Sequence, residues 1–172
     1  QNTARQLAAR ADVVIENFRP GVMTRLGLDA GTLRTENPKL VYCSISGFGQ
    51  NKPRAGYDLM VQGLSGIPTL TGSPEGPPNK CGASIADMMA GSNASQAILA
   101  ALFRRERTGE GATIDVAMID GQLSLLTYHA GAHLNGGTNP SRIGNAHPSI
   151  HPFCQYEAED GFFNLCVGND DI

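Results

Sequence analysis

Positive charge is in short supply in this sequence. The 172 residues contain 13 Lys and Arg against 16 Asp and Glu, a formal net charge of -3, and the cations are scattered along the chain. A protein that follows a phosphate backbone needs a face enriched in Lys and Arg, and none is indicated here. Nucleic acid is therefore not an expected partner.

Cysteine is scarce, and its spacing is not that of a metal site. The four cysteines lie far apart, form no CxxC pair and mostly sit in apolar runs. This pattern favours buried free thiols over disulfides or zinc ligands, and a reducing, cytoplasmic compartment over an oxidising one. The residues are Cys43, Cys81, Cys154 and Cys166.

Long hydrophobic runs are also missing. No apolar run reaches the roughly 18 to 20 residues of a membrane span, and no charged-then-apolar leader precedes a cleavage site. We expect no membrane association. Hydrophobic residues make up 41% and charged residues 17% of the chain, as in globular proteins with a core. The chain starts without Met in an expected helix and ends on an uncovered strand, so we expect a fragment of a larger enzyme.

Several common site motifs are absent. No GxGxxG follows an expected strand, and neither a Walker sequence nor a GxSxG elbow occurs. His129 and His133 are four residues apart, but no acid accompanies them as in zinc proteases, and His147 and His151 each precede proline. Core or turn positions are the commoner setting for such histidines. No metal or nucleotide cofactor is expected.

The first third of the chain alternates between strand and helix patterns. We expect a strand with a buried Val-Val-Ile core over residues 12–18, then a short helix with Pro20 in its first turn that ends at Gly27. A second helix is expected from the N-cap Asp29 to Asn37-Pro38, followed by an apolar strand over residues 39–48 that is buried on both faces. Such a βαβ unit predicts an α/β fold with a parallel sheet.

The rest of the chain is punctuated by glycine and proline. Residues 47–82 predict a long loop, a type that is often functional, with a short helix inside it. The expected elements are a helix at 57–66, a long Ala-rich helix at 90–109, an alternating strand at 112–120, a helix at 121–134, a turn-rich connector at 136–152, and a hairpin at 153–169 that turns at Asp160-Gly161.

Asp87 lies among small and apolar residues at the head of the Ala-rich helix. By position it is an N-cap or first-turn acid that the helix dipole favours. A poorly solvated carboxylate with the small neighbours Ala90 and Gly91 is also suited to attack an activated acyl group. The two interpretations are compatible.

The segment ENFRPG, residues 16–21, ends the first expected strand. Open parallel sheets bind ligands at the carboxyl ends of their strands. Arg19 and Arg25 have the chemistry to hold phosphates by bidentate hydrogen bonds, and they fit equally well as solvated charges beside a helix.

Read in order, these segments resemble the class III CoA-transferases, a superfamily that includes formyl-CoA, carnitine and benzylsuccinate CoA-transferases and the α-methylacyl-CoA racemases. The blocks are DVVIENFRPGVMTRLGLD, NPKLVYCSISGFGQ, YDLMVQGLSG, SIADMMAGSNASQAILAALFRRERTGEG, IDVAMIDG, GNAHPSIHPF and DGFFNLCVGND. The resemblance implies a Rossmann-like large domain, a smaller α+β domain, and a homodimer of interlocked chains. Residues 1–135 would belong to the large domain, and residues 136–172 to the linker and the start of the small one.

The resemblance implies a ping-pong transfer of CoA from an acyl-CoA to a small carboxylic acid. Asp87 matches the acyl-accepting nucleophile, which forms aspartyl anhydride and aspartyl-CoA intermediates. Asn17, Phe18 and Arg25 match CoA-binding positions, with Arg19 as their neighbour. CoA is then a substrate, and no resident cofactor is required. The donor and acceptor acids stay open.

Three alternatives remain open. In the racemases a His-Asp pair supplies a second base, and here that pair reads Tyr57-Asp58. Tyrosine, with a reference pKa near 10, is a poor base at neutral pH, so transfer is favoured over racemisation. Tyr57 and Asp58 are candidates for lining the substrate site or for starting a short helix. A non-catalytic CoA-binding or assembly module and an acyl-CoA hydrolase are the other two.

Overall fold

Three parallel strands form the central sheet of the computed structural model, which describes residues 2–170. The strands are β1 (Val13–Glu16), β2 (Val41–Ser46) and β3 (Ala112–Ala117), in the order β1-β2-β3. Val41 pairs with both Val13 and Ala112. The α/β fold and its parallel sheet are thereby confirmed.

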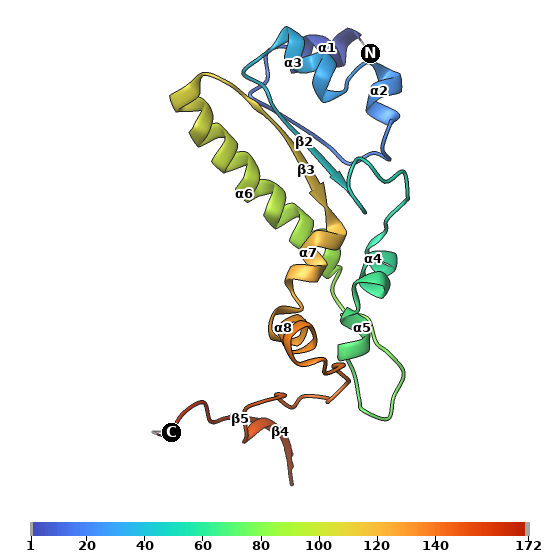
Figure 1. The fold of residues 1–172 in the computed structure, drawn as a ribbon, viewed down its shortest axis with the longest axis vertical. Helices are drawn as coiled ribbons and strands as arrows, with labels where there is room; N and C mark the ends of the chain where they lie inside the picture. Colours follow the sequence, from blue (N-terminus) through green and yellow to red (C-terminus); the bar gives the residue numbers. More distant parts are fainter. Residues whose placement is uncertain (1, 171–172) are drawn as a thin grey trace.

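Helices cover both faces of this sheet (Figure 1). On one side lie α1 (Asn2–Ala8), α2 (Val22–Leu26) and α3 (Ala30–Glu36), and on the other lies α6 (Ile85–Thr108). Because side chains alternate along a strand, β2 sends Tyr42 into the first core and Cys43 into the second. The central strand is buried on both faces, as the sequence predicts.

The predicted burial of the first strand is wrong for Ile15, whose side chain is 58% exposed. The helix α6 packs across β2 and β3, so it leaves this end of β1 uncovered in the described residues.

Small side chains bring α6 close to the sheet. Its buried residues follow helical spacing: Ala86, Ala90, Ala94, Ile98 and Ala101. The helix ends at Gly109, where φ is +76° and the amide bonds the carbonyl of Arg105 at 2.7 Å. It begins at Ile85, so Asp87 lies in its first turn as predicted.

Local signals also place α3 correctly. The Asp29 side chain accepts a hydrogen bond from the Thr32 amide at 3.1 Å, and the helix ends just before Asn37-Pro38. Pro20 is a small exception, because it precedes the N-cap Gly21 and does not enter α2.

The middle and later elements differ from prediction in two places. The strand expected at 112–120 ends at Ala117, since α7 (Met118–Ser124) begins at the next residue. The single helix expected at 121–134 is split into α7 and α8 (Thr127–Gly136), and Thr127 takes a φ of +40° at the break. The expected helix at 57–66 is α4 (Asp58–Ser65), and α5 (Ile67–Leu70) follows it directly.

A separate antiparallel hairpin lies at the opposite end of the molecule from α1 and α3 (Figure 1). It consists of β4 (Phe153–Ala158) and β5 (Gly161–Cys166), and Ala158 pairs with Gly161. The turn residues are therefore Glu159 and Asp160, one position earlier than predicted. In the described part of the chain, no helix has both the length and the apolar character to cross a membrane.

All four cysteines are free thiols. Cys43 is buried as predicted, whereas Cys81 and Cys154 are partly buried. The expectation of burial is wrong for Cys166, because β5 is exposed along its whole length.

Candidate active site at the carboxyl ends of the strands

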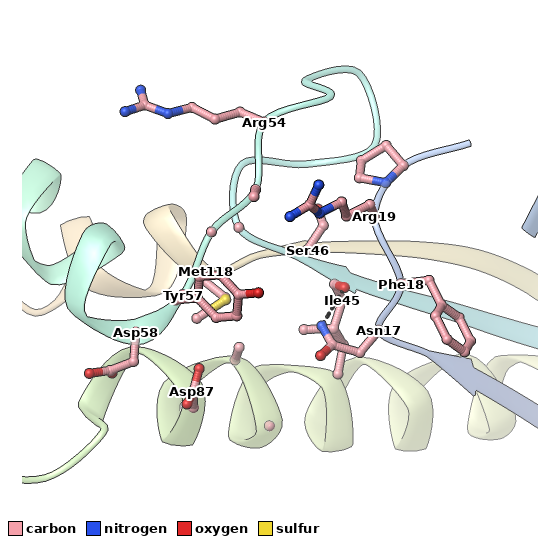
Figure 2. Close-up of a pocket in the computed structure, with 16 residues that line it drawn as sticks. Asn17, Phe18, Arg19, Ile45, Ser46, Arg54, Tyr57, Asp58, Asp87 and Met118 are labelled. Atoms are coloured by element: carbon pink, nitrogen blue, oxygen red, sulfur yellow. Dashed lines mark hydrogen bonds between the residues drawn. The ribbon is translucent and has the colours of Figure 1, made fainter. Parts of the chain in front are cut away.

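A cleft of about 460 Å³ lies where the three parallel strands end. Asn17 follows β1, Ser46 closes β2 and Met118 follows β3, and all three line the cleft (Figure 2). This is the position at which an open α/β sheet binds its ligands, so the expected location of the site is confirmed.

Asp87 enters this cleft from the first turn of α6 (Figure 2). Ala90 and Gly91, which follow in the next turn, also line it, and a β-carbon at Gly91 would have no neighbour within 4 Å. The floor beside the carboxylate is therefore open. Partial burial, and secondarily the charge of Asp58, raise the pKa of Asp87 above its ordinary value of 3.8.

The cap of α6 comes from another helix. Ser84 occupies the N-cap position but makes no side-chain capping hydrogen bond. Instead, Oδ1 of Asp58, at the start of α4, accepts a hydrogen bond from the Ala86 amide at 2.9 Å. Because Asp58 supplies this bond, Asp87 is a first-turn acid and its own carboxylate is directed to the cleft.

The opposite wall is the segment that follows β1. Asn17 donates from Nδ2 to the Ile45 carbonyl at 2.7 Å, and the buried carboxylate of Glu16 accepts from the Phe18 amide at 2.8 Å. These bonds tie the segment to the end of β2. Asn17, Phe18 and Arg19 all line the cleft, although the Phe18 ring turns away from Asp87 (Figure 2).

Arg25 does not line the cleft. It lies in the last turn of α2, and a β-carbon on Gly21 would be 3.6 Å from its Nη1. The φ of +83° at Gly21 lets the chain turn into α2 here. The structure thus brings Arg19 into the cleft and holds Arg25 outside it.

Tyr57 and Asp58 line the cleft on the side of α4. Tyr57 is 69% exposed and stands above Asp87 in Figure 2. Arg54 also lines the cleft, and the sequence reasoning missed it. Its guanidinium carbon lies 5.0 Å from the centre of the Phe48 ring. A cation three residues before Tyr57 in a Gly- and Pro-rich loop was the available signal.

Within residues 2–170, no group of three His, Cys, Asp or Glu side chains is arranged to hold a metal ion. His147 has a structural use, because its Nδ1 accepts hydrogen bonds from the amides of Ser149 and Ile150 at 3.2 and 3.1 Å. The ring of Tyr128 lies against His129 and His147, with centroid distances of 4.6 and 5.2 Å.

Comparison with known proteins agrees with this geometry. The model of CoA-transferase family III matches residues 1–172. The chain belongs to this family. It is 48% identical over 169 residues to succinate--glutarate CoA-transferase of Agrobacterium fabrum, a match that covers 96% of the chain and 42% of that protein. It is 46% identical over 171 residues to acetyl-CoA:oxalate CoA-transferase of Acetobacter aceti, with 97% and 44% covered.

Solved structures of the family superpose well. A CAIB/BAIF family protein from Brucella suis aligns with a TM-score of 0.90 and 45% identity over 99% of the chain and 46% of that protein. A protein from Mycobacterium tuberculosis aligns with a TM-score of 0.82 and 34% identity, over 96% of the chain and 44% of that protein. The family III chain thus spans less than half the length of these relatives, and its expected character as a part of the large domain fits.

Proposed function

We propose that the protein containing this chain is a CoA-transferase that moves CoA from an acyl-CoA thioester to a free carboxylic acid, with Asp87 as the nucleophile. The observation that carries the proposal is the carboxylate of Asp87 at the cleft where three strands end. A raised pKa makes a carboxylate more basic and hence a better nucleophile, while moderate elevation leaves it ionised at neutral pH.

Four displacements complete the transfer. An oxygen of Asp87 attacks the donor thioester, the C–S bond breaks, and CoA leaves as a thiolate from a mixed anhydride. The thiolate attacks the aspartyl carbonyl and releases the donor acid as its carboxylate. The acceptor carboxylate attacks the aspartyl-CoA thioester, and the released thiolate finally takes the acceptor acyl group and restores Asp87. The thioester energy is conserved, and no proton, metal or redox cofactor is consumed.

The far wall is assigned to CoA. Asn17 and Phe18 are placed to contact the pantetheine arm as it enters the cleft, and Arg19 to bind phosphate. We assign Arg25, outside the cleft, to the nucleotide end of CoA. Tyr57 and Asp58 would face the acyl group. CoA acts as a substrate here, so no resident cofactor is proposed.

We further propose that donor and acceptor are short dicarboxylic acids. The support is the naming of relatives, whose acids include succinate and glutarate in Agrobacterium fabrum, oxalate in Acetobacter aceti, and succinate and glutarate in the 36% identical human relative. Residues 1–135 would belong to the large domain and residues 136–172 to the linker and the start of the small one. The working form would be an interlocked homodimer in the cytoplasm.

The proposal is tested by trapping the intermediate. The intact protein is incubated with succinyl-CoA, acetyl-CoA and longer acyl-CoAs and quenched with hydroxylamine, and the peptide containing Asp87 is examined by mass spectrometry. We expect a hydroxamate at Asp87 that requires acyl-CoA and is lost in Asp87→Ala. Exchange of α-protons with deuterated water at an unmodified Asp87 would instead establish a racemase. Release of free CoA without an acceptor would indicate a hydrolase, and no reaction with any thioester would indicate a binding module.

A further inference from the structure

Gln62 is a fully buried polar residue on α4, and every polar atom of its side chain is paired. Nε2 donates to Oδ2 of Asp58 at 2.7 Å and to the Ala83 carbonyl at 3.3 Å. Oε1 accepts from the Cys81 amide at 2.8 Å. A flipped amide would set its oxygen against two acceptors, so the surroundings dictate its orientation.

These bonds form a path to the nucleophile. Asp58 gives one carboxylate oxygen to Gln62 and the other to the Ala86 amide, one residue before Asp87. Through Cys81 and Ala83, Gln62 also holds the segment that leads into α6. The start of α6 is thus attached to α4 at two places, and both attachments pass through the same amide group.

Burial alone does not explain this arrangement. Gln122 on α7 is also fully buried, yet its Nε2 and Oε1 have no hydrogen-bond partner among the described residues. A glutamine in this core therefore need not be paired, whereas Gln62 is paired at each position. The pairings converge on the one helix turn that carries Asp87.

We propose that Gln62 is a positioning residue for Asp87. Its amide fixes the rotamer of Asp58, so that Oδ1 is aimed at the start of α6 and the Asp87 carboxylate is held toward the cleft. The inference goes beyond the proposed transfer, and only its kinetic readout rests on that function.

The decisive variant is Gln62→Glu in the intact protein. While the introduced carboxyl group keeps its proton it donates to Asp58 as the amide does, but once it ionises the two carboxylates repel each other. The ionisable groups around this pair are Tyr57, Lys80 and Asp87. We expect kcat of the variant to approach the wild-type value at acid pH and to fall at higher pH, by roughly 10- to 100-fold, with KM little changed. The wild type should lack this descending limb.

Two further variants separate positioning from simple packing. Gln62→Met should lose kcat at every pH, and the matched Gln122→Met should keep it, because Gln122 has no pairing to lose among the described residues. The exchange Asp58→Asn with Gln62→Glu restores a donor opposite an acceptor, and we expect it to recover most of the kcat that Gln62→Glu loses at high pH.

Hydrogen exchange at the Ala86 amide gives a readout that does not need activity. In Gln62→Glu this amide should lose protection as the pH rises, relative to wild type at the same pH, while amides of the central strand stay protected. Equal protection and equal kcat in all variants would overturn the inference. So would a pH-independent loss that follows thermal stability in both Met variants. If the wild type transfers no CoA, the proposed function fails, and the Ala86 amide still decides this inference.

Discussion

Asp58 and Ala86, 28 residues apart in the sequence, are joined by a hydrogen bond of 2.9 Å between a carboxylate oxygen of α4 and an amide of α6. The bond satisfies one of the amides that a helix start leaves open. The same carboxylate contributes to the raised pKa of Asp87. One side chain therefore stabilises the helix that carries the proposed nucleophile and adjusts its basicity.

Removing the charge of Asp58 should move the acid limb of activity. Asp58→Asn keeps an oxygen that can accept from Ala86 but removes the repulsion that raises the pKa of Asp87. Since Asp87 must be ionised to attack, the acid limb of the pH–kcat profile should shift to lower pH. The control is Asp120→Asn in the first turn of α7. An acid limb that stays in place in Asp58→Asn would contradict this electrostatic account.

The nucleophile should cost the protein stability at neutral pH. The pKa of Asp87 is raised in the folded state, so the folded protein binds this proton more tightly than the unfolded chain does. The resulting stability is fully present below the ordinary pKa of 3.8 and is lost as the pH rises through the folded value. Asp87→Asn should therefore be more stable than wild type near neutral pH.

This difference should disappear in acid, where Asp87 of the wild type is protonated too. Urea unfolding followed by circular dichroism across the pH range measures it. A stability gain for Asp87→Asn that persisted unchanged below pH 3.8 would point to a cause other than ionisation.

Two glycines set the width of the cleft. A β-carbon on Gly47, just after β2, would lie 2.5 Å from the α-carbon of Gly56, which precedes α4. Both residues line the cleft, so Gly47→Ala should force these segments apart, destabilise the fold by about 1–3 kcal/mol and raise KM for acyl-CoA. Thermal unfolding and steady-state kinetics measure the two effects.

Gly63 provides the matched control inside α4. A β-carbon there would have no neighbour within 4 Å, so Gly63→Ala should stabilise the protein by about 0.5–1 kcal/mol and leave KM unchanged. Similar behaviour of the two alanine variants would show that the contact between Gly47 and Gly56 does not shape the cleft.

Arg19 should contribute to CoA affinity through charge. It lines the cleft, and a hydrogen bond between charged groups is worth enough that Arg19→Ala should raise KM for acyl-CoA by about tenfold or more. The dependence of KM on salt should weaken as well. Arg107→Ala is the control, because that guanidinium lies 4.5 Å from the centre of the Phe103 ring near the end of α6. Equal KM values in the two variants would exclude Arg19 from CoA binding.

Features that depend on neighbouring residues were predictable from the sequence. Asp29 and Asn37-Pro38 bound α3, and the apolar run of β2 marks a strand buried on both faces, because capping and burial leave a local pattern. The break before Thr127 was not predictable, since α7 and α8 form one continuous helical pattern and packing decides where it bends.

The sequence by itself determined the family, the parallel α/β order and the first-turn position of Asp87, because these follow from ordered motifs, periodicity and helix-start chemistry. Only the tertiary structure decided which residues meet. It placed Arg19 in the cleft and Arg25 outside it, and brought Asp58 and Gln62 to the start of α6. Hydrogen bonds between segments 19 to 28 residues apart depend on how the elements pack, and no local pattern encodes that arrangement.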